Sequence, residues 1–544
     1  MITALREWRV GTGNRDDTLT ARRRSWLDPG VVAPICAAGV YVAVVVLRLP
    51  ALLSSYFSYT DFPEALRLGD AVFHGEYGQG LAVPSQSGIG PLWVVGLINQ
   101  ATGGQVAAMA FGAVVLLVTA GLMAWTTWRV FGARAAIAVA ALCVATPPVV
   151  AWEFLTPIAH EGTLLMTAVF AWQLVALSRG LRGAGIAASI VVGALAAVCI
   201  VSDPLVLAAA VVPWMMCVTP LALRHRSRRP AVLLTVCVGV AVAAIIVVWA
   251  AANHIVERGN TAFAFSMQGF TDGLRTTVAT LGQMFTGAWY SDVLSGVVAI
   301  GALAFFLGII YMASRIVSAL RGEAVPAQRI YVWFWLLSSA GIVGAFCVSG
   351  LGIQRSPVNY QGHYVDGLWF AVAALLPLGM LAVPRRRGFV VAGVTCLALV
   401  SAAGIARAPA YPFAGPDYAD SAQLTSTLEH LGVTHGYGGY WESYAVGWFT
   451  GGRADALPLQ QCSAGTSATG LCRYEFAAPA WYQERPGPVF VIVLRAPCRG
   501  DDLCISAANL AGLPSPEAVR TVGLLQVYVY ADDVFAALPT ATHP

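Results

Sequence analysis

The sequence predicts a polytopic α-helical membrane protein with about eleven transmembrane helices, followed by a small α/β domain outside the membrane. Hydrophobic residues make up 58% of the 544 residues and charged residues only 11%, whereas an average soluble domain carries about 25% charged residues. The mean hydropathy is +0.69. Apolar runs long enough to cross a bilayer recur up to residue 406. From about Arg407 the apolar runs shorten and turn residues multiply.

This composition excludes several classes of protein. A soluble enzyme or a disordered chain would carry far more charge. The net charge is only +4 and the basic residues form no single stripe, so we expect no nucleic-acid partner. The sequence contains no Walker motif, which argues against an ATP-driven pump.

The N-terminal segment predicts an uncleaved first span. Residues 1–30 are polar and contain three consecutive arginines, and an apolar run then covers residues 31–49. The residues that follow, 50–53, form no small-residue cleavage site. We therefore expect a cytoplasmic tail over 1–30 and a first transmembrane helix over 31–49.

The later apolar runs and the arginines between them predict the topology. The runs cover residues 105–128, 135–150, 160–178, 184–201, 204–222, 231–252, 294–313, 330–349, 366–383 and 389–406. A shorter run, 89–101, is interrupted by glycine and proline, which fits a surface or re-entrant helix. If this run does not cross the membrane, every short arginine-rich loop lies on the same side of the membrane, the cytoplasmic one. The positive-inside rule then predicts a multi-pass protein of the cell membrane, with the N-terminus inside and the C-terminal domain outside.

In this predicted topology, arginines and acidic residues lie mostly on opposite sides of the membrane. The predicted inner side holds 20 of the 32 arginines, whereas most acidic residues lie in outer segments, at outer span ends and in the C-terminal domain. Topology alone accounts for part of this bias. Several of the outer acidic residues lie beside aromatic and histidine residues, which indicates a polar cavity at the outer membrane face.

Residues 407–544 predict a separate α/β domain. The sequences VFVIVLRA (489–496) and LLQVYVYA (524–531) are typical of buried strands. The segment 417–432 predicts an amphipathic helix that ends at Gly432.

Four of the 11 cysteines lie in this domain, and their spacing fits neither a CxxC motif nor a zinc site. In an oxidising compartment they pair most simply as Cys462–Cys472 and Cys498–Cys504. The seven other cysteines lie in or near apolar spans, where a free cysteine behaves as a small hydrophobic residue.

An outer loop over residues 50–104 follows the first span and holds a pair of carboxylates. Asp61 and Glu64 are three residues apart, so they share one face of a helix. Asp61-Phe62-Pro63-Glu64 also fits a capping box with a proline in the first turn. Capping and catalysis both stay open, and they are compatible because a capping residue also positions its carboxylate.

A second polar cluster lies in the sequence WEFLTPIAHEGTLL. Glu153, His160 and Glu161 fall in the outer loop between two runs, and Leu164 stands where a metalloprotease HExxH motif would need histidine. The cluster is either an acidic loop rim or a site for a sugar or a divalent metal. Asp203, beside Pro204 at an outer span end, is either a further polar contact or a helix cap.

The order of these features resembles the GT-C glycosyltransferases, which include protein O-mannosyltransferases and the aminoarabinose transferases of lipid A. An acidic residue follows the first span, a surface helix with a Pro-Leu core follows as GPLW (90–93), and a span ends near FGAR within 128–148. The stretch 436–453 and the sequence VGLLQVYVY are similar to the outer domain of some bacterial relatives. The last outer loop of such proteins often carries Arg-Tyr before a span with proline. Here the pair is His363-Tyr364, with Arg355 upstream and Pro377 in the span.

The resemblance implies a polyprenyl-phosphate sugar as donor, because nucleotide sugars are cytoplasmic and the predicted site faces outward. Transfer needs a carboxylate that accepts the proton of the attacking hydroxyl. It also needs groups that stabilise the departing phosphate and a groove for the lipid tail. The resemblance makes Asp61 the base, with Glu64 in support.

The substrate-binding candidates fall into two groups. Arg355, Tyr360, His363 and Tyr364 are candidates for the phosphate, and Glu153, His160 and Glu161 for the donor or acceptor sugar. Arg355 is alternatively an interfacial anchor, and His363 is alternatively a histidine satisfied at the membrane interface.

We therefore expect a glycosyltransferase that moves a sugar from a polyprenyl-phosphate-linked donor to an acceptor hydroxyl of a lipid, glycan or protein at the outer membrane face. The main alternative is a transporter or flippase of a lipid-linked saccharide, which would favour charges within spans and an internal repeat. A non-catalytic assembly protein of the cell envelope is a third interpretation. The sequence leaves the sugar, the acceptor and the use of a divalent metal open.

Overall fold

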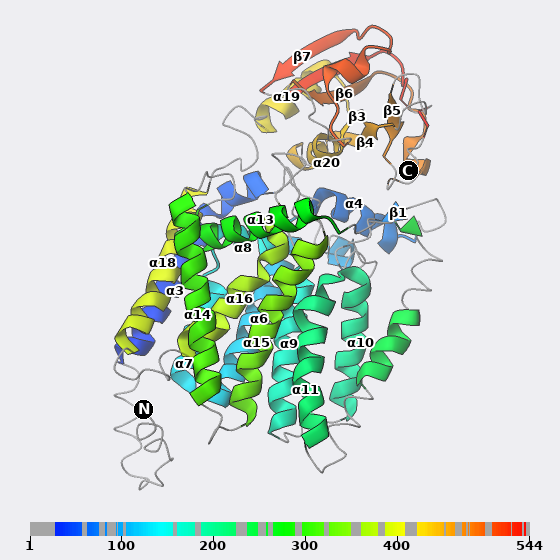
Figure 1. Ribbon diagram of the computed structural model, residues 1–544. Coiled ribbons are helices and arrows are strands. Elements are labelled where there is room, and N and C mark those ends of the chain that lie inside the picture. Colours follow the sequence, from blue (N-terminus) through cyan, green and yellow to red (C-terminus); the bar gives the residue numbers. More distant parts are fainter. Residues whose placement is uncertain are drawn as a thin grey trace.

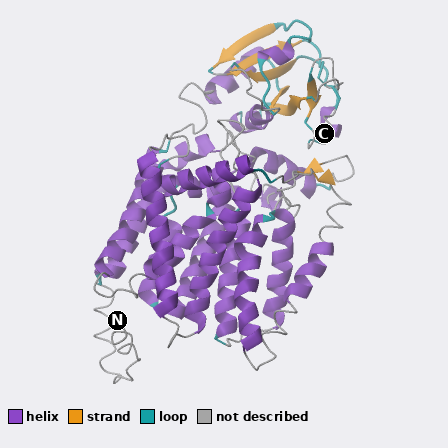
Figure 2. Cartoon of the chain, viewed as in Figure 1, coloured by secondary structure: helices purple, strands orange, loops and turns teal. Residues whose placement is uncertain are grey.

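The computed structural model shows a bundle of long helices with a small sheet domain at one of its ends (Figure 1). Figure 2 shows that the bundle is helical and that the larger sheet lies in the domain. We call the end of the bundle that faces this domain, where α3 ends at Tyr56 and α9 begins at Glu161, the domain end. The structure describes residues 28–56, 62–75, 82–83, 94, 96–98, 100–101, 105–155, 160–179, 186–224, 237–247, 257–258, 265–288, 296–319, 326–349, 361–378, 387–408, 421–450, 453–462, 470–474, 477, 479–495, 503–523, 525–535 and 538–539.

Within these residues, five helices are long and apolar enough to cross a membrane. They are α3 (Pro29–Tyr56), α6 (Gln105–Phe131), α9 (Glu161–Ser178), α15 (Pro326–Ser349) and α18 (Arg387–Arg407). Each coincides with one of the predicted runs, so the prediction of a polytopic helical membrane protein is confirmed. Exposed apolar side chains such as Val46 and Leu47, 62% and 80% exposed, fit contact with lipid.

The other six predicted runs also contain apolar helices, of 10–17 residues each. The elements that hold them are α7 (Ala133–Val144), α10 (Ile186–Ser202), the π-helical turn η3 (Leu207–Val211) with α11 (Val212–Arg224), a helix at Cys237–Val247, α14 (Gly296–Ala319), and η4 (Gln361–Val365) with α16 (Gly367–Leu375) and η5 (Leu376–Leu378). A helix rises about 1.5 Å per residue and the hydrocarbon core is about 30 Å thick. Lengths this short do not establish crossings, so eleven spans remain a prediction.

One predicted run is divided in the structure. The sequence pattern predicts a single span over 135–150, but α7 ends at Val144 and α8 (Pro148–Leu155) begins after a short break. Two consecutive prolines, Pro147 and Pro148, explain the break, because proline has no N–H for the helix ladder and disfavours helical backbone in the residue before it. α8 contacts η4 and the amphipathic helix α13, and it contributes to the domain end.

The ends of the bundle are held by polar contacts and close backbone packing. α3 packs along α18, and Arg48 donates to the carbonyl oxygen of Ala408 at 2.5 Å. At the opposite end, Asp28 and Arg134 form an ion pair of 2.5 Å. A Cβ atom on Gly404 would lie 2.1 Å from the carbonyl oxygen of Gly287, so α18 approaches this turn only because both residues are glycine.

Two helices and a pair of short strands lie at the domain end. α4 (Phe62–Phe73) begins one residue after Asp61, as the capping pattern predicts. α13 (Met267–Thr286) lies across the helix ends in Figure 1 and was not expected from the apolar runs, because it is amphipathic rather than apolar. The strands β1 (Ala82–Val83) and β2 (Glu257–Arg258) pair in parallel, and so join two distant loops.

The sheet domain contains a mixed sheet of six strands in the order β5-β4-β3-β6-β8-β7. The strands are β3 (His435–Gly439), β4 (Asp455–Gln461), β5 (Leu471–Arg473), β6 (Val489–Leu494), β7 (Ala518–Val522) and β8 (Leu525–Tyr530). β3 pairs in parallel with β4 and β6, and the other pairings are antiparallel. The helices are α19 (Ser421–Leu431), α20 (Tyr440–Phe449) and the 3-10 turns η7 (Pro479–Tyr482) and η8 (Ala507–Leu510).

The predicted elements of this domain are confirmed. β6 is buried on both faces, with Val489 and Val491 in one apolar cluster and Phe490 and Ile492 in the other, which explains its uninterrupted apolar run. β8 lies within the predicted 524–531. α19 ends one residue before Gly432, whose φ of 67° is the left-handed conformation that terminates helices.

One of the two predicted disulfides is confirmed. Cys462 and Cys472 are bonded, with 5.3 Å between their Cα atoms, and they connect the end of β4 to β5. Cys504 is also disulfide-bonded. Its predicted partner Cys498 lies outside the described residues, so that pairing stays a prediction.

Candidate functional site

A buried histidine–aspartate pair lies at the domain end of the bundle. His160 immediately precedes α9, and Asp203 immediately follows α10. Nδ1 of His160 lies 2.7 Å from Oδ2 of Asp203, and the hydroxyl of Thr163 donates to the same oxygen. His160 and Asp203 are 6% and 7% exposed, so the pair is formed largely out of water.

The local sequence explains how these residues come to face each other. Pro204 interrupts the chain after α10, and Asp203 Oδ1 accepts a hydrogen bond of 2.9 Å from the N–H of Leu205. Asp203 is therefore a cap for the next helical segment, and its second oxygen is directed to His160. Thr163 lies three residues after His160, one turn into α9, so both side chains reach the same carboxylate.

Two ring side chains of η4, His363 and Tyr364, pack against His160. The rings of His160 and His363 are stacked, with centroids 5.5 Å apart and an interplanar angle of 18°. The Tyr364 ring lies 4.8 Å from His160 and 5.9 Å from Phe346 of α15. We call His160, Thr163, Asp203, His363 and Tyr364 the histidine cluster.

The charge of Asp203 is stabilised within this cluster. Burial alone would raise the pKa of Asp203. The attraction of His160 and hydrogen bonds from His160, Thr163 and the Leu205 N–H outweigh burial, and hold the pKa below its usual range. Asp203 therefore stays ionised, and its carboxylate accepts a hydrogen bond from Nδ1–H of His160. When His160 is protonated, Nε2 carries a second N–H, and this is the donor that the ring offers to an anion.

Two further buried carboxylates lie next to the cluster in the chain. Glu161 is the first residue of α9, and Asp366 immediately precedes α16; they are 6% and 1% exposed. In the described residues no three His, Cys, Asp or Glu side chains are grouped as metal ligands. The histidine cluster is chemically suited to donate hydrogen bonds and positive charge to an anion such as a phosphate.

The structure brings together several of the residues predicted to bind substrate. His160 and Glu161 lie at the start of α9, beside His363 and Tyr364 of η4. α8, which carries Glu153, also contacts η4. Two regions that are distant in the sequence, the one from α8 to the start of α9 and the one around η4, therefore converge at the domain end.

Other predicted residues are not described at the level of side chains. Asp61, Arg355 and Tyr360 lie outside the described residues. Glu64 is in α4 and Glu153 in α8, but only their backbone is described. The catalytic and binding roles assigned to these residues stay predictions.

Sequence reasoning missed two parts of this region. Thr163 carries no motif, although its position three residues after His160 is the one signal that could have indicated it. The sequence leaves two roles open for Asp203, a polar contact or a helix cap, and the structure shows that it has both. The helix α13 could have been found from Ser266 and Gly287, because Ser266 accepts from the Gly269 N–H and Gly287 has a φ of 66°.

The architecture matches solved structures of membrane transferases. ArnT from Cupriavidus metallidurans in the apo state has a TM-score of 0.52 at 14% sequence identity, over 91% of this chain and 98% of ArnT. The chain has the GT-C fold. The resemblance read from the short motifs around the first span is therefore confirmed at the level of fold.

Other GT-C structures match at lower scores. ArnT bound to undecaprenyl phosphate has a TM-score of 0.44 at 14% identity, over 90% of this chain and 98% of ArnT. The oligosaccharyltransferase AglB from Archaeoglobus fulgidus, with an inhibitory peptide and a dolichol-phosphate, has a TM-score of 0.46 at 13% identity, over 85% of this chain and 69% of AglB. No family model and no curated protein matches the sequence.

Proposed function

We propose that the protein is an integral-membrane glycosyltransferase of the GT-C type. It moves a sugar from a polyprenyl-phosphate donor to an acceptor hydroxyl of a lipid, glycan or protein. The observation that carries this proposal is the buried histidine cluster at the domain end of a GT-C fold. Its hydrogen-bond donors and aromatic rings are suited to a phosphate that joins a sugar to a lipid.

The departing polyprenyl phosphate needs stabilisation of negative charge as the bond to the anomeric carbon breaks. His160, held in one orientation by Asp203, and the neighbouring His363 and Tyr364 supply hydrogen-bond donors for this charge. Arg355 and Tyr360, which precede η4 in the sequence, extend this phosphate-binding group. Glu153 and Glu161 accept hydrogen bonds from sugar hydroxyls.

The reaction also needs a base for the attacking hydroxyl. Asp61 takes this role, with Glu64 in support: Glu64 lies in the first turn of α4 at the domain end, and Asp61 immediately precedes this helix in the sequence. The bond that forms joins the acceptor oxygen to the anomeric carbon, and the bond that breaks joins this carbon to the phosphate oxygen. The acceptor proton passes to the carboxylate, and polyprenyl phosphate leaves.

The domain end is the extracytoplasmic side in this proposal. The arginines of α6 and α7, Arg129 and Arg134, lie at the opposite end of the bundle, where positive residues favour the cytoplasm. A site on the extracytoplasmic side has no access to nucleotide sugars, which supports a lipid-linked donor. ArnT and AglB have been solved with undecaprenyl phosphate and dolichol-phosphate, respectively.

The test uses the full chain purified in lipid nanodiscs and a panel of radiolabelled polyprenyl monophosphate sugars that carry hexoses or pentoses. Envelope lipids, glycans and proteins serve as acceptors. We expect one donor to transfer its label and to leave free polyprenyl phosphate. A folded protein that cleaves none of the donors would contradict the proposal. In sealed vesicles, movement of intact donor across the bilayer without cleavage would instead identify a flippase.

A further inference from the structure

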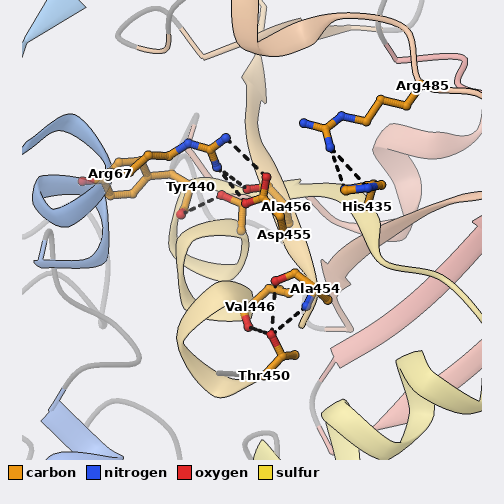
Figure 3. A network of polar contacts seen from close by, with 10 residues as sticks. Arg67, His435, Tyr440, Val446, Thr450, Ala454, Asp455, Ala456 and Arg485 are labelled. Carbon is orange, nitrogen blue, oxygen red and sulfur yellow. Dashed lines mark hydrogen bonds and ion pairs between the residues drawn. The ribbon is translucent and has the colours of Figure 1, made fainter. Parts of the chain in front are cut away.

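A single arginine of α4 joins the bundle to the sheet domain. Arg67 donates to the Asp455 carboxylate, with Nη1–Oδ1 and Nη2–Oδ2 distances of 2.9 Å and 3.4 Å. Nη1 of Arg67 also lies 3.4 Å from the carbonyl oxygen of Ala456. Figure 3 shows the Arg67 guanidinium directed at the first residues of β4.

This contact is more than an isolated surface ion pair. The Arg67 guanidinium carbon lies 4.6 Å from the centre of the Trp481 ring, so the cation is stacked as well as hydrogen-bonded. The Arg67 side chain is 24% exposed, and that of Asp455 is 43% exposed. Two hydrogen bonds to one carboxylate fix the orientation of a planar guanidinium, which a lysine would not achieve. α20 of the domain also contacts α4.

α4 is also packed along a neighbouring face. Leu68, Ala71 and Val72 are buried, at spacings that place them on one helix face. A Cβ on Gly96 would lie 2.1 Å from the carbonyl oxygen of Gly69, so the two backbones touch. α4 is therefore held both by this packing, which includes Gly96, and by its contact with the sheet domain.

Arg67 lies close to the proposed catalytic carboxylates in the sequence. Glu64 is three residues earlier on the same helix, about 4.5 Å along the axis, and Asp61 immediately precedes the helix. A rotation or shift of α4 would therefore move both carboxylates together.

We infer that Arg67 is a positioning residue, through which the sheet domain fixes α4 and the carboxylates at its start. This inference rests on the proposed function, because it assigns Asp61 and Glu64 to the reaction. Its physical basis is that a displacement of about 1 Å in a reacting group costs up to 10²-fold in rate. The sheet domain thus acts on turnover without contributing a group to the chemistry.

The test in the full chain first removes each charge of the pair and then exchanges the two charges. Arg67→Met keeps part of the apolar stem of the side chain and removes its charge and its donors, and Asp455→Asn removes the negative charge of the partner. We expect each variant to lower kcat about tenfold, with little change in the KM for the donor. The double variant should lose no more than either single one. Exchanging the partners, as Arg67→Asp with Asp455→Arg, should restore most of kcat.

A matched control lies in the same domain. Glu429 pairs with Arg453 on an exposed surface, and the contact involves α19 rather than α4. Glu429→Gln removes this ion pair, and we expect a change in kcat of less than about twofold. A similar loss of kcat in this control would show that general loosening of the domain causes the effect, and it would contradict the inference.

Amide hydrogen exchange over residues 62–73 gives a readout that does not depend on activity. Arg67→Met should raise the rate of amide hydrogen exchange in α4. The double variant Arg67→Asp with Asp455→Arg should lower that rate again. If α4 loosens while kcat stays at the wild-type level, the positioning role is wrong and the proposed function survives. If the wild-type protein transfers no sugar, the proposed function and the positioning role both fail, and the exchange data still report the docking of α4.

Discussion

The imidazole rings of His160 and His363 are stacked with an interplanar angle of 18°, although they come from two separate loop regions of the chain. Asp203 contacts only the first of the two, at Nδ1. The paired rings are therefore not equivalent. One is fixed in tautomer and orientation by a carboxylate, and the other is placed by stacking and by its neighbour Tyr364.

The fixed histidine leads to the first prediction. Asp203→Asn keeps a cap acceptor for the Leu205 N–H but removes the charge that orients His160. We expect sugar transfer to fall about tenfold, and His160→Ala to lower it by about 10²-fold. The measurement is kcat/KM for the polyprenyl donor, with thermal stability in parallel. His430→Ala, a change at an exposed histidine of α19, is the control; equal losses in both histidine variants would refute a role for the cluster.

The second prediction concerns the carboxylate before α4. If Asp61 accepts the acceptor proton, Asp61→Asn should lower kcat by about 10²–10⁴-fold and leave donor binding unchanged. If Asp61 only caps α4, asparagine should replace it with little effect, because it caps helices about as well as aspartate. Sugar transfer at saturating donor distinguishes the two roles. Near-full activity would exclude Asp61 as the base, and Glu64→Gln would then be the next variant to measure.

The third prediction concerns pH. Burial and the nearby Arg485 lower the pKa of His435 below 6.5, whereas Asp455 opposes this shift. Arg485 NH1 lies 2.7 Å from Nδ1 of His435 (Figure 3), a contact in which neutral histidine accepts the hydrogen bond.

Because the unfolded state binds the proton more readily, the contribution of His435 to stability is present above pH 6.5. It is lost as the pH falls through the lower pKa of the folded state. We expect the thermal stability of the sheet domain to fall between about pH 7 and pH 5. His435→Gln should flatten this part of the curve, and an unchanged curve would show that other groups cause it.

The fourth prediction concerns the confirmed disulfide. Replacing both Cys462 and Cys472 with serine should destabilise the sheet domain by about 2–4 kcal/mol, because the unfolded domain regains the freedom of a loop. Protease resistance in increasing urea measures the effect. Cys36→Ser, which removes an exposed free cysteine of α3, should leave the midpoint unchanged. Non-reducing peptide mass spectrometry should also recover Cys498 bonded to Cys504.

The fifth prediction concerns orientation. Alkaline phosphatase inserted at Gly487, a turn with a φ of 95°, should be active if the sheet domain lies outside the cytoplasm, as the proposed topology requires. A green fluorescent protein inserted in the arginine-rich loop after α11 should be fluorescent. The reverse pattern would overturn the topology and the assignment of the site to the extracytoplasmic side.

The sequence was most informative where a single segment determines its own structure. The buried strand β6 follows from an uninterrupted apolar run, and the end of α19 follows from Gly432. The amphipathic α13 is not visible as an apolar run, and its only local signal is the cap at Ser266 with Gly287 at its end. The break between α7 and α8 was visible as two prolines, but it lies within an otherwise apolar run.

Contacts between distant segments could not be predicted in the same way. His160 and Tyr364 were both selected as candidates, yet nothing in either segment indicates that their rings lie 4.8 Å apart. The parallel pairing of β3 with β4 and β6 likewise depends on how the chain crosses over, not on the strands themselves. Arg67 carries no signal in its own segment, because its partner Asp455 lies in the other part of the molecule.

The separation of Arg67 and Asp455, 388 residues along the chain, has a consequence for synthesis. At about 5–20 residues per second, a ribosome needs about 20–80 s to reach the second residue after the first. During this interval most of the bundle has already been made, and α4 has no carboxylate to bind. If Arg67 positions α4 as we propose, the newly made bundle becomes competent for turnover only when its final domain has folded against the loop made near the start.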